Sequence, residues 1–587
     1  MEAPLPTLVD LLHRAGASDE AGIRVIDRHD AAEWLPWSAI RRRALQVAGG
    51  LQAIGIEPGD RVALIFPTSP GFFDAFFGAL LAGGIPVPMY PPVRLGRLDQ
   101  YRDQAVRMID AVRASVVLAD GGVRRLLGEV IERARPPLGC RTIDDLPAGE
   151  ASPASPTARD LALIQFSSGT TRDPQPVALS HRAVAWQAIT LNGFWPDEQG
   201  VVHSGASWLP LYHDMGLIGC VFPALERPGT VTLLPPEAFV ASPARWLQTI
   251  ARYRATISPA PNFAYSLCTR KIRDEELEGV DLSCWRVALS GAETVVPDVL
   301  RAFARRFAPW GFRGEALTPV YGLSEASLAV TFTPVGRGVG SRRFERASLE
   351  RGGLARPTAE GREIVSVGQP IPGTAVRIVG EDGLVLAEGR LGEVECRGPS
   401  VMEGYFDRPD ATAAACRDGW LRTGDLGFVL EGELYLAGRL RDILLVHGRN
   451  HSPEEVEAAA GEVPGVRAGC VVAASWLPED ADGEQVLVLA EAARGVRASR
   501  FDAIARACGD AVLAATALPP GHVAILAPGT LPRTSSGKLR RREALRQYLA
   551  GELRPPAPVT APRVTLAIAR SMGAFLRARL RKGGSAL

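Results

Sequence analysis

Several features that mark other protein classes are missing from this sequence of 587 residues. Its eight cysteines form no Cys-x-x-Cys pair, so neither a zinc site nor a disulfide framework is indicated. No window reaches the ~18 uncharged apolar residues of a membrane helix. Residues 1–6 show no basic region followed by an apolar core, as a secretory signal would. A net charge of +1 gives no general attraction to nucleic acid. We therefore expect a cytoplasmic protein without a transmembrane segment or a nucleic-acid partner.

Lysine is scarce as well. Lys271, Lys538 and Lys582 are the only lysines among 66 basic residues. Lys538 follows Ser535-Ser536-Gly537, and a lysine in such a turn suggests that a compact, mobile ammonium is needed where a planar guanidinium would not serve. This predicts a catalytic lysine. Taken alone, an exposed lysine present by chance explains the position equally well, so the prediction depends on motifs elsewhere in the chain.

The length exceeds what a single hydrophobic core of ~250–300 residues supports, so two or more domains are expected. Residues 61–66 and 114–119 have the apolar pattern of strands, and residues 71–81 have that of a helix packed beside them. This alternation predicts parallel α/β layers. From residue 434 onward the elements become shorter, which places a boundary near Leu440.

A candidate phosphate loop follows the apolar, strand-like run at residues 161–166. It consists of Ser167, Ser168, Gly169, Thr170 and Thr171, whose backbone N–H groups and hydroxyls can surround phosphate oxygens. The Gly-x-x-x-x-Gly-Lys-Ser/Thr pattern is absent, which argues against a P-loop nucleotidase. A hydroxyl-rich turn without function is the alternative for this segment alone.

Three further motifs follow in order: Tyr321-Gly322-Leu323-Ser324-Glu325, residues 421–427 (LRTGDLG) and residues 438–442 (GRLRD). Together with the hydroxyl loop and the Lys538 segment, they resemble the adenylate-forming superfamily. The resemblance implies an α/β fold with a large multi-layer N-terminal domain at residues 1–439 and a small mobile α+β lid at residues 440–549. Residues 550–587 would be a Pro-rich linker and a basic tail beyond the resemblance.

Within that superfamily the sequence is most similar to the fatty acyl-AMP ligases. The similarity rests on residues 86–92, 208–217, 260–265 and 285–293, of which the His213-Asp214-Met215 segment is the most specific. A long stretch around residues 336–360 is also typical of this subgroup, where an insertion is thought to hinder the domain rotation needed for thioester formation with coenzyme A. A tolerated surface loop is the alternative, since long insertions cost little stability.

The resemblance implies that a fatty acid and ATP form an acyl adenylate, with Mg²⁺ as the metal, and that pyrophosphate leaves. The acyl group would pass to the phosphopantetheine thiol of an acyl carrier protein or of a carrier domain in a polyketide or nonribosomal synthase. No Gly-x-Asp-Ser-Leu carrier motif occurs in this chain, so the carrier would be a separate protein.

Family positions imply a role for each candidate residue. Lys538 would bridge the attacking carboxylate and the α-phosphate, Glu325 would hold Mg²⁺, and His213 would orient the carboxylate. The nucleotide would contact the hydroxyl loop together with Gly291, Ala292, Glu293, Tyr321, Gly322, Asp425 and Arg439, with Tyr321 stacked on adenine and Asp425 on the ribose hydroxyls. The acyl chain would lie near Met215, Leu217, Gly219, Asn262 and Phe263, and Arg441 would be the hinge of the lid.

One departure from the superfamily pattern affects the phosphate loop. Arg172, Gln175 and Pro176 stand where a glycine, a lysine and a second glycine are usual, so one phosphate-facing cation is lost unless Arg172 supplies it. Three functions therefore stay open: a fatty acyl-AMP ligase, an acyl-CoA synthetase that uses free coenzyme A, and a catalytically weak protein that binds acyl adenylates. An amino-acid adenylation domain is disfavoured, because no acidic residue is apparent where such domains anchor the substrate amine.

The last part of the chain predicts one more element. Residues 554–558 (RPPAP) form a stiff linker. Residues 564–582 combine apolar residues at helical spacing with a cluster of basic residues, which indicates a short cationic amphipathic helix. A solvated or self-packed tail and a surface for an acidic carrier protein or a membrane are the alternatives.

Overall fold

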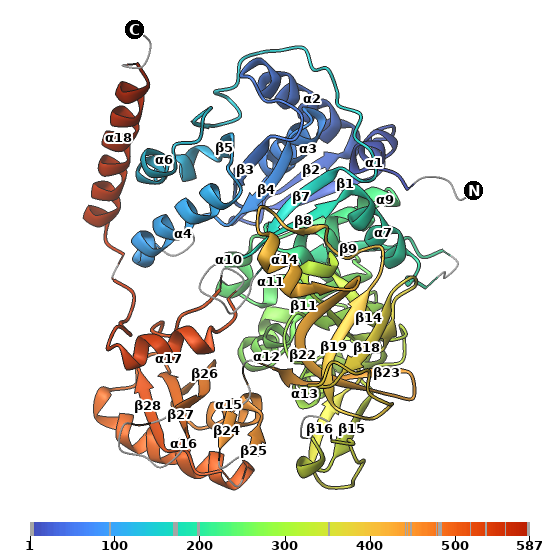
Figure 1. Cartoon of the computed structure of the whole chain (residues 1–587), viewed down its shortest axis with the longest axis vertical. Coiled ribbons are helices and arrows are strands. Elements are labelled where there is room, and N and C mark those ends of the chain that lie inside the picture. Colours follow the sequence, from blue (N-terminus) through green and yellow to red (C-terminus); the bar gives the residue numbers. More distant parts are fainter. Residues whose placement is uncertain are drawn as a thin grey trace.

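The computed structural model of the chain describes residues 5–92, 95–167, 174–196, 200–349, 353–440, 442, 444–446, 449–476, 478, 484–516, 518–534, 537–557 and 559–583. Figure 1 shows two groups of elements: a large N-terminal group and a smaller C-terminal group, drawn in orange and red. The mixed α/β architecture predicted from the sequence is confirmed. The domain boundaries at residues 439 and 549 remain predictions.

A four-stranded parallel sheet lies near the N-terminus, in the order β4-β3-β5-β6. Its strands are β3 (Arg61–Ile65), β4 (Ile85–Met89), β5 (Val116–Ala119) and β6 (Cys140–Arg141). Helix α3 (Pro70–Leu81) brings four fully buried phenylalanines to the core. The two predicted strands and the predicted helix of this region are confirmed. Each has apolar side chains that it can bury only against a neighbouring element, and a layer of helix on sheet achieves this.

A larger sheet has nine strands among the described residues, in the order β17-β14-β13-β12-β11-β9-β10-β1-β2. From β13 to β1 the neighbouring strands are parallel, whereas β2, β14 and β17 pair antiparallel at the two edges. The strands are β1 (Gly22–Ile26), β2 (Ala32–Pro36), β9 (Ser204–Ser207), β10 (Thr230–Leu233), β11 (Ile257–Pro261), β12 (Val287–Gly291), β13 (Leu317–Gly322), β14 (Ala329–Phe332) and β17 (Gln369–Pro370). Parallel strands place their carboxyl ends at one edge of a sheet, which is where ligands bind in open α/β folds.

Two smaller sheets and one two-stranded sheet also belong to the N-terminal group. One is formed by β7 (Leu161–Phe166), β8 (Pro176–Ser180) and β20 (Gly404–Tyr405). The other is formed by β18 (Ala375–Val379), β19 (Gly392–Arg397), β21 (Cys416–Arg417), β22 (Trp420–Leu430) and β23 (Glu433–Arg439). Strands β15 (Ser341–Phe344) and β16 (Arg362–Val365) pair with each other.

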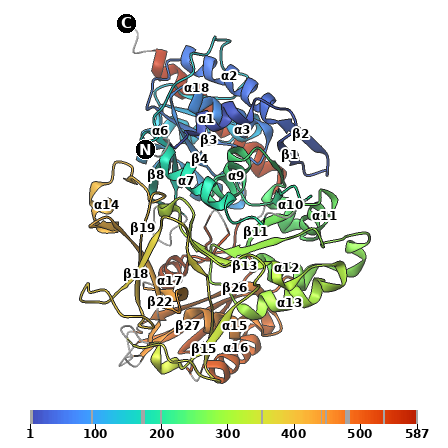
Figure 2. The same cartoon turned by 90° about the vertical axis from the view of Figure 1, so that its right-hand side faces the viewer.

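Helices pack against these sheets (Figures 1 and 2). The longer ones are α1 (Leu8–Ala15), α2 (Trp37–Ala53), α4 (Leu98–Ala111), α6 (Gly128–Ala134), α7 (His181–Asn192), α11 (Ala244–Arg252), α12 (Asn262–Lys271), α13 (Pro297–Phe307) and α14 (Pro409–Ala415). The shorter ones are α5 (Gly121–Arg124), α8 (Asp214–Gly216), α9 (Phe222–Glu226) and α10 (Pro236–Ala241).

The C-terminal group has its own core. Its elements are β24 (Leu444–Val446), β25 (Arg449–His451), α15 (Pro453–Gly461), β26 (Val466–Trp476), β27 (Gln485–Ala492), α16 (Phe501–Thr516), β28 (His522–Leu526) and α17 (Arg541–Leu549). After α17 the chain returns to the N-terminal group, where α18 (Ala561–Gly583) lies beside α6 (Figure 1). The predicted helix at residues 564–582 is therefore confirmed. Among the described residues, none of the helices combines the length and apolarity that crossing a membrane requires.

Candidate active site

The carboxyl ends of β12 and β13 place two of the predicted motifs beside each other. The strands are parallel, with Ser290 opposite Pro319. Gly291 therefore ends one strand next to Tyr321 and Gly322, which end the other. Gly322 has no room for a side chain, because a Cβ there would lie 1.7 Å from the carbonyl oxygen of Leu328.

Backbone strain marks the same edge of the sheet. Ala292 follows β12 with φ of 67°, and Ser327 follows the short turn Ser324–Ala326 with φ of 62°. A residue other than glycine in the left-handed region costs ~1–3 kcal/mol, and such residues cluster at functional sites. The strain thus falls directly after β12 and directly after the turn that contains Glu325.

A cavity of about 180 Å³ opens at this edge and joins two kinds of surface. Its polar end is lined by His213, Asp214, Ser324, Glu325, Tyr405, Arg422, Thr423, Asp425, Arg439 and Lys538. Its apolar end is lined by Leu191, Trp195, Leu289, Val320, Leu328, Ala329 and Phe332. Ser167, Met215, Gly219, Ala292, Tyr321 and Gly322 also face it. A cavity of this kind suits an amphiphilic molecule with a charged head and a hydrocarbon part.

The carboxylate of Asp425 is held in place from two sides. It lies on β22 directly opposite Arg439 of β23. The Tyr321 hydroxyl donates to Oδ2 of Asp425 at 2.7 Å, and Nε of Arg439 lies 3.1 Å from Oδ1. The charge of Asp425 raises the pKa of Arg439, so the guanidinium stays charged. Each carboxylate oxygen can accept a second hydrogen bond, which leaves Asp425 able to bind hydroxyl groups in the cavity.

A second buried carboxylate, Asp214, positions His213. Nδ1 of His213 lies 2.5 Å from Oδ1 of Asp214, and the Ser324 hydroxyl donates to Oδ2 at 2.6 Å. Burial alone would raise the pKa of Asp214, but His213, Ser324 and the charge of Lys538 outweigh it and hold the pKa below its usual range. Nε2 of His213 is buried and has no hydrogen-bond partner among the described residues. Since the ring also lines the cavity, that nitrogen is available to a bound molecule.

Glu325 is the third carboxylate of the polar end. It accepts a hydrogen bond of 2.9 Å from the hydroxyl of Tyr405. Burial raises the pKa of Glu325, and the nearby negative charge of Asp214 adds to the increase. No group of three or more His, Cys, Asp or Glu side chains suited to a metal ion occurs within the described part of the chain. A divalent ion here would therefore need oxygen ligands from a bound substrate as well as from Glu325.

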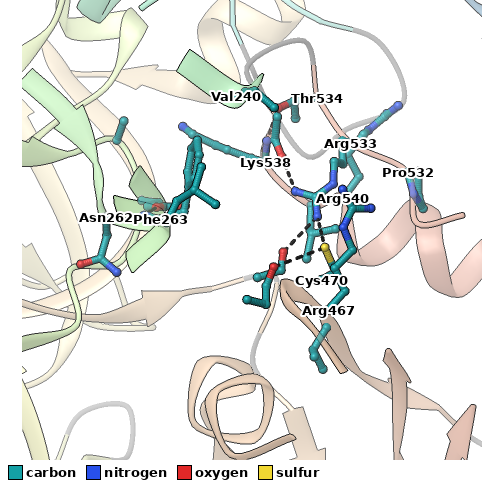
Figure 3. A pocket seen from close by; sticks show the side chains of 18 of the residues that line it. Val240, Asn262, Phe263, Arg467, Cys470, Pro532, Arg533, Thr534, Lys538 and Arg540 are labelled. Carbon is teal, nitrogen blue, oxygen red and sulfur yellow. Dashed lines mark hydrogen bonds between the residues drawn. The ribbon is translucent and has the colours of Figure 1, made fainter. Parts of the chain in front are cut away.

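Lys538 reaches this cavity from the C-terminal group. A tight turn holds it: the backbone N–H of Lys538 donates to the Thr534 hydroxyl at 3.1 Å, and the N–H of Thr534 donates to the Lys538 carbonyl at 2.8 Å. Gly537 adopts φ of 91° in this turn, a conformation that favours glycine. Figure 3 shows Lys538 extending from this segment toward the side of Asn262 and Phe263.

The charge of Lys538 is balanced by its neighbours. Burial lowers the pKa of Lys538 below its usual range, and repulsion from Arg439 adds to that effect. Attraction to the carboxylates of Asp214, Glu293 and Asp425 opposes the decrease. The ammonium thus lies where the polar groups of the cavity converge, as expected of a mobile point charge.

The structure brings together most of the predicted site residues, but not all of them. Glu293, Asn262 and Phe263 line a wider cleft of about 2640 Å³ between the two groups of elements, which Lys538 and Arg439 also border. There the Glu293 carboxylate accepts the backbone N–H of Phe263 at 2.6 Å, and the Asn262 side-chain oxygen accepts the N–H of Val296 at 3.1 Å.

Two of the described predicted residues line neither the smaller cavity nor the wider cleft. Leu217 is fully buried in the hydrophobic core, and Gly291 lies against Val320, whose atoms would be 2.9 Å from a Cβ. Met215 and Gly219 do face it, because residues four apart share one side of a helix whereas Leu217 points to the other side. Ser168, Gly169, Thr170, Thr171, Arg172 and Arg441 lie outside the described residues.

The residues at the apolar end of the cavity were not predicted from the sequence. Leu191 and Trp195 come from α7 and the turn after it, and Leu289, Val320 and Phe332 come from three strands of the nine-stranded sheet. Phe332 stacks on Phe194 with ring centroids 4.3 Å apart, which fixes the wall of the cavity. No local motif marks these positions. The run Phe194-Trp195-Pro196 was the one signal available, as a cluster of large apolar side chains after a helix.

Comparison with known proteins agrees with this geometry. The model of the AMP-binding enzyme family matches residues 14–406. The chain belongs to the AMP-binding enzyme family. A Caulobacter vibrioides protein provisionally named an acyl-CoA synthetase is 38% identical, over 94% of this chain and 96% of its own length. The long-chain-fatty-acid–AMP ligase FadD26 of Mycobacterium marinum is 35% identical, over 89% of this chain and 93% of its own.

A solved structure shows the same relationship in three dimensions. It comes from a study of fatty acyl-adenylate ligases of E. coli and L. pneumophila, with a TM-score of 0.86, 32% identity and coverage of 94% of this chain and 98% of the other. The resemblance to fatty acyl-AMP ligases within the adenylate-forming enzymes is thereby confirmed.

Proposed function

We propose that this protein activates a fatty acid with ATP, forming an acyl adenylate and releasing pyrophosphate. The observation that carries the proposal is the single cavity that joins a charged end, with Asp425, Glu325 and Lys538, to an apolar end. An acyl adenylate has the same two parts: a nucleotide with hydroxyls and phosphate, and a hydrocarbon chain. The ribose hydroxyls donate hydrogen bonds to the Asp425 carboxylate, and the chain contacts the apolar wall to which Trp195 and Phe332 belong.

The reaction is an in-line displacement. A carboxylate oxygen of the fatty acid attacks the α-phosphorus of ATP, a P–O bond forms, and the bond to the pyrophosphate oxygen breaks with its electron pair leaving on pyrophosphate. No proton need be transferred. Both reactants are anions, so the protein has to hold them in line and neutralise the growing charge. Lys538 does so as a mobile cation brought in by the C-terminal group.

His213 orients the attacking carboxylate. With Nδ1 held by the Asp214 carboxylate, the ring keeps one orientation, which leaves Nε2, without a partner among the described residues, for the bound carboxylate. Mg²⁺, when bound with ATP, supplies further charge neutralisation at the phosphate oxygens, and Glu325 is the residue that would hold it. The raised pKa of Glu325 means that proton and metal compete for this carboxylate.

The stretch around residues 336–360 supports transfer to a carrier protein over transfer to free coenzyme A. Phe344 of β15 is fully buried against Phe428 and Tyr435, so this insertion is part of the folded N-terminal group. Arg346, two residues further on, forms an ion pair with Glu455 of α15 in the C-terminal group. The insertion thus connects the two groups directly and opposes rotation of the lid about the predicted hinge at Arg441. We propose that the acyl group passes to the phosphopantetheine thiol of a separate carrier protein.

Pyrophosphate release tests the adenylation step. We expect release that requires both ATP and a fatty acid, and that rises with chain length until the apolar end of the cavity is filled. A Gly219→Trp variant should lose the longer acids first, because the Leu328 side chain already lies 2.8 Å from a Cβ at this position. Pyrophosphate release that does not depend on a fatty acid would contradict the proposal. Absence of release with every fatty acid would also contradict it and would favour a protein that binds acyl adenylates without turnover.

An acyl-CoA synthetase is the second candidate, favoured by the name of the Caulobacter vibrioides relative. Variants of the Arg346–Glu455 ion pair distinguish this function from that of an acyl-AMP ligase. Arg346→Glu and Glu455→Arg should each release the lid and raise acyl-CoA formation, whereas the double exchange should restore the wild-type product. A charge exchange is a sharper test than deleting the insertion, because removal of Phe344 would expose a buried aromatic cluster.

A further inference from the structure

The C-terminal helix α18 is attached to the N-terminal group along one face. The backbone N–H of Gly128 in α6 donates to the buried Ser571 hydroxyl at 2.7 Å, and a Cβ at Gly128 would lie 1.9 Å from the Ser571 carbonyl oxygen. Arg577 forms a two-pronged ion pair with Glu132, with both N···O distances 2.8 Å. These contacts fix the rotation of the helix about its axis, and with it the face that points outward.

The outward face of α18 is apolar. Leu566, Met572 and Leu576 are 51%, 60% and 61% exposed, although each is a large hydrophobic side chain. With the exposed Ala569 they recur every three or four residues, which is the spacing of one helix face. We call these four residues the outer stripe. Single exposed apolar side chains are ordinary, but an aligned set on an anchored helix marks an interaction surface.

Basic residues accompany the outer stripe. Arg563 and Arg570 lie seven residues apart and so form a short arginine row along one edge of it, whereas Arg577, seven residues further on, is held by Glu132. From residue 553 to residue 587 the sequence has seven basic residues, at positions 554, 563, 570, 577, 579, 581 and 582, and no acidic one. Because the total net charge is +1, residues 1–552 together carry a net charge of −6. The positive charge is therefore concentrated in the tail that carries the stripe.

We propose that the outer stripe and its arginine row dock α18 on the surface of a membrane that contains anionic lipids. A helix with an apolar stripe beside arginines lies in the plane of the headgroups, with the apolar side chains inserted and the arginines among the lipid phosphates. The helix lies on the membrane and does not span it, because its arginines interrupt every long apolar run. A second copy of the chain fits this face less well, since two tails of the same positive charge repel each other.

The location suits the chemistry of the reaction. Fatty acids partition into bilayers, so a docked enzyme works where its substrate is concentrated. The anchor on α6 belongs to the N-terminal group, which carries most of the cavity walls. Membrane docking would thus leave the C-terminal group, which supplies Lys538, free of the lipid contact.

Vesicle flotation of the full-length protein tests the proposal. The vesicles are phosphatidylcholine alone or phosphatidylcholine mixed equally with phosphatidylglycerol. We expect at least tenfold more protein to float with the anionic vesicles at low salt, and high salt to reduce that binding. Met572→Glu combined with Leu576→Glu should reduce it at least tenfold, while pyrophosphate release with a water-soluble acid stays unchanged. The matched control is Leu384→Glu with Val385→Glu, the same change at two exposed apolar residues in the turn after β18, which should bind as wild type does.

Three results would overturn the proposal. The first is a wild-type protein that does not float with anionic vesicles at low salt. The second is a Met572/Leu576 variant that floats as well as wild type does. The third is a wild-type dimer that this variant converts to a monomer without any vesicle binding, which would assign the outer stripe to a second copy of the chain.

Discussion

Replacing Lys538 by methionine should abolish most of the adenylation activity and leave ATP binding largely intact. Methionine keeps the length and the apolar stem of the side chain but removes the ammonium. That ammonium is attracted by the carboxylates of Asp214, Glu293 and Asp425. It lies where the negative charges of the two reactants would meet. The loss therefore falls on the transition state, in which charge builds up, more than on the bound nucleotide.

The size of the effect follows from Coulomb's law. Two unit charges ~4 Å apart interact by ~4 kcal/mol at an effective dielectric constant of ~20, the value suited to a partly buried site. Each ~1.4 kcal/mol of transition-state stabilisation is a factor of ten in rate, so the variant should be slower by ~10³-fold. Lys538→Arg should also be slow, because the turn from Thr534 to Lys538 fixes the start of the side chain and a planar guanidinium is larger than the ammonium.

The assay is the initial rate of pyrophosphate release at saturating ATP and fatty acid, with ATP affinity measured separately by calorimetry. Lys271→Met is the matched control, since it removes an exposed lysine at the last turn of α12 and should stay within twofold of wild type. A Lys538→Met rate within fivefold of wild type would refute the assignment. So would an equal loss of ATP affinity and rate, since that would make Lys538 a binding residue only.

Three further predictions address the nucleotide, the acyl chain and the pH dependence of stability. Asp425→Asn should weaken ATP binding by ~10–100-fold, which is the scale of one or two charge-assisted hydrogen bonds. Tyr321→Phe should weaken it by less, because it removes only the hydroxyl that holds Asp425. Equal ATP affinity of wild type and Asp425→Asn in calorimetry would contradict this. Phe332→Ala should extend the usable acid by a few carbons in a chain-length series of pyrophosphate release, since Phe332 walls the apolar end; an unchanged optimum would place the chain elsewhere. His181 is buried and accepts the N–H of Leu8 at Nδ1, and burial lowers its pKa from 6.5 to about 4. The unfolded chain therefore binds a proton that the folded chain excludes as pH falls from 6.5 to 4, so the free energy of unfolding should fall by about 3 kcal/mol over that window. Urea unfolding of a non-titrating His181→Asn variant should lack this part of the pH dependence, and identical pH profiles would rule out the effect.

The charged end of the site could be predicted from the sequence, because its residues lie in short local motifs. Tyr321 and Glu325 share one turn, Asp425 sits in a Thr-Gly-Asp segment, and Lys538 stands out by the scarcity of lysine. Their contacts with one another needed the structure. The hydrogen bond from Tyr321 to Asp425 joins residues 104 apart in sequence, and the one from Ser324 to Asp214 joins residues 110 apart.

The apolar end could not be predicted, for a physical reason. Leu191, Leu289, Val320 and Phe332 are ordinary core residues by composition and periodicity, and only the packing of α7 over the sheet leaves a cavity between them. Leu217 is the opposite case, a residue predicted at the site that lies in the core. It lies in the most specific motif, yet the helical geometry from Asp214 to Val221 turns it into the core while Met215 and Gly219 face the cavity.

The decisive experiment supplies wild-type protein with ATP, a fatty acid and coenzyme A, and separates acyl-AMP from acyl-CoA by chromatography. We expect that acyl-AMP accumulates, that almost no acyl-CoA forms, and that a phosphopantetheine-bearing carrier protein accepts the acyl group. Efficient synthesis of acyl-CoA by the intact protein would contradict the role given to the insertion and would identify an acyl-CoA synthetase. Absence of both products, with the adenylate bound but not made, would contradict catalysis itself.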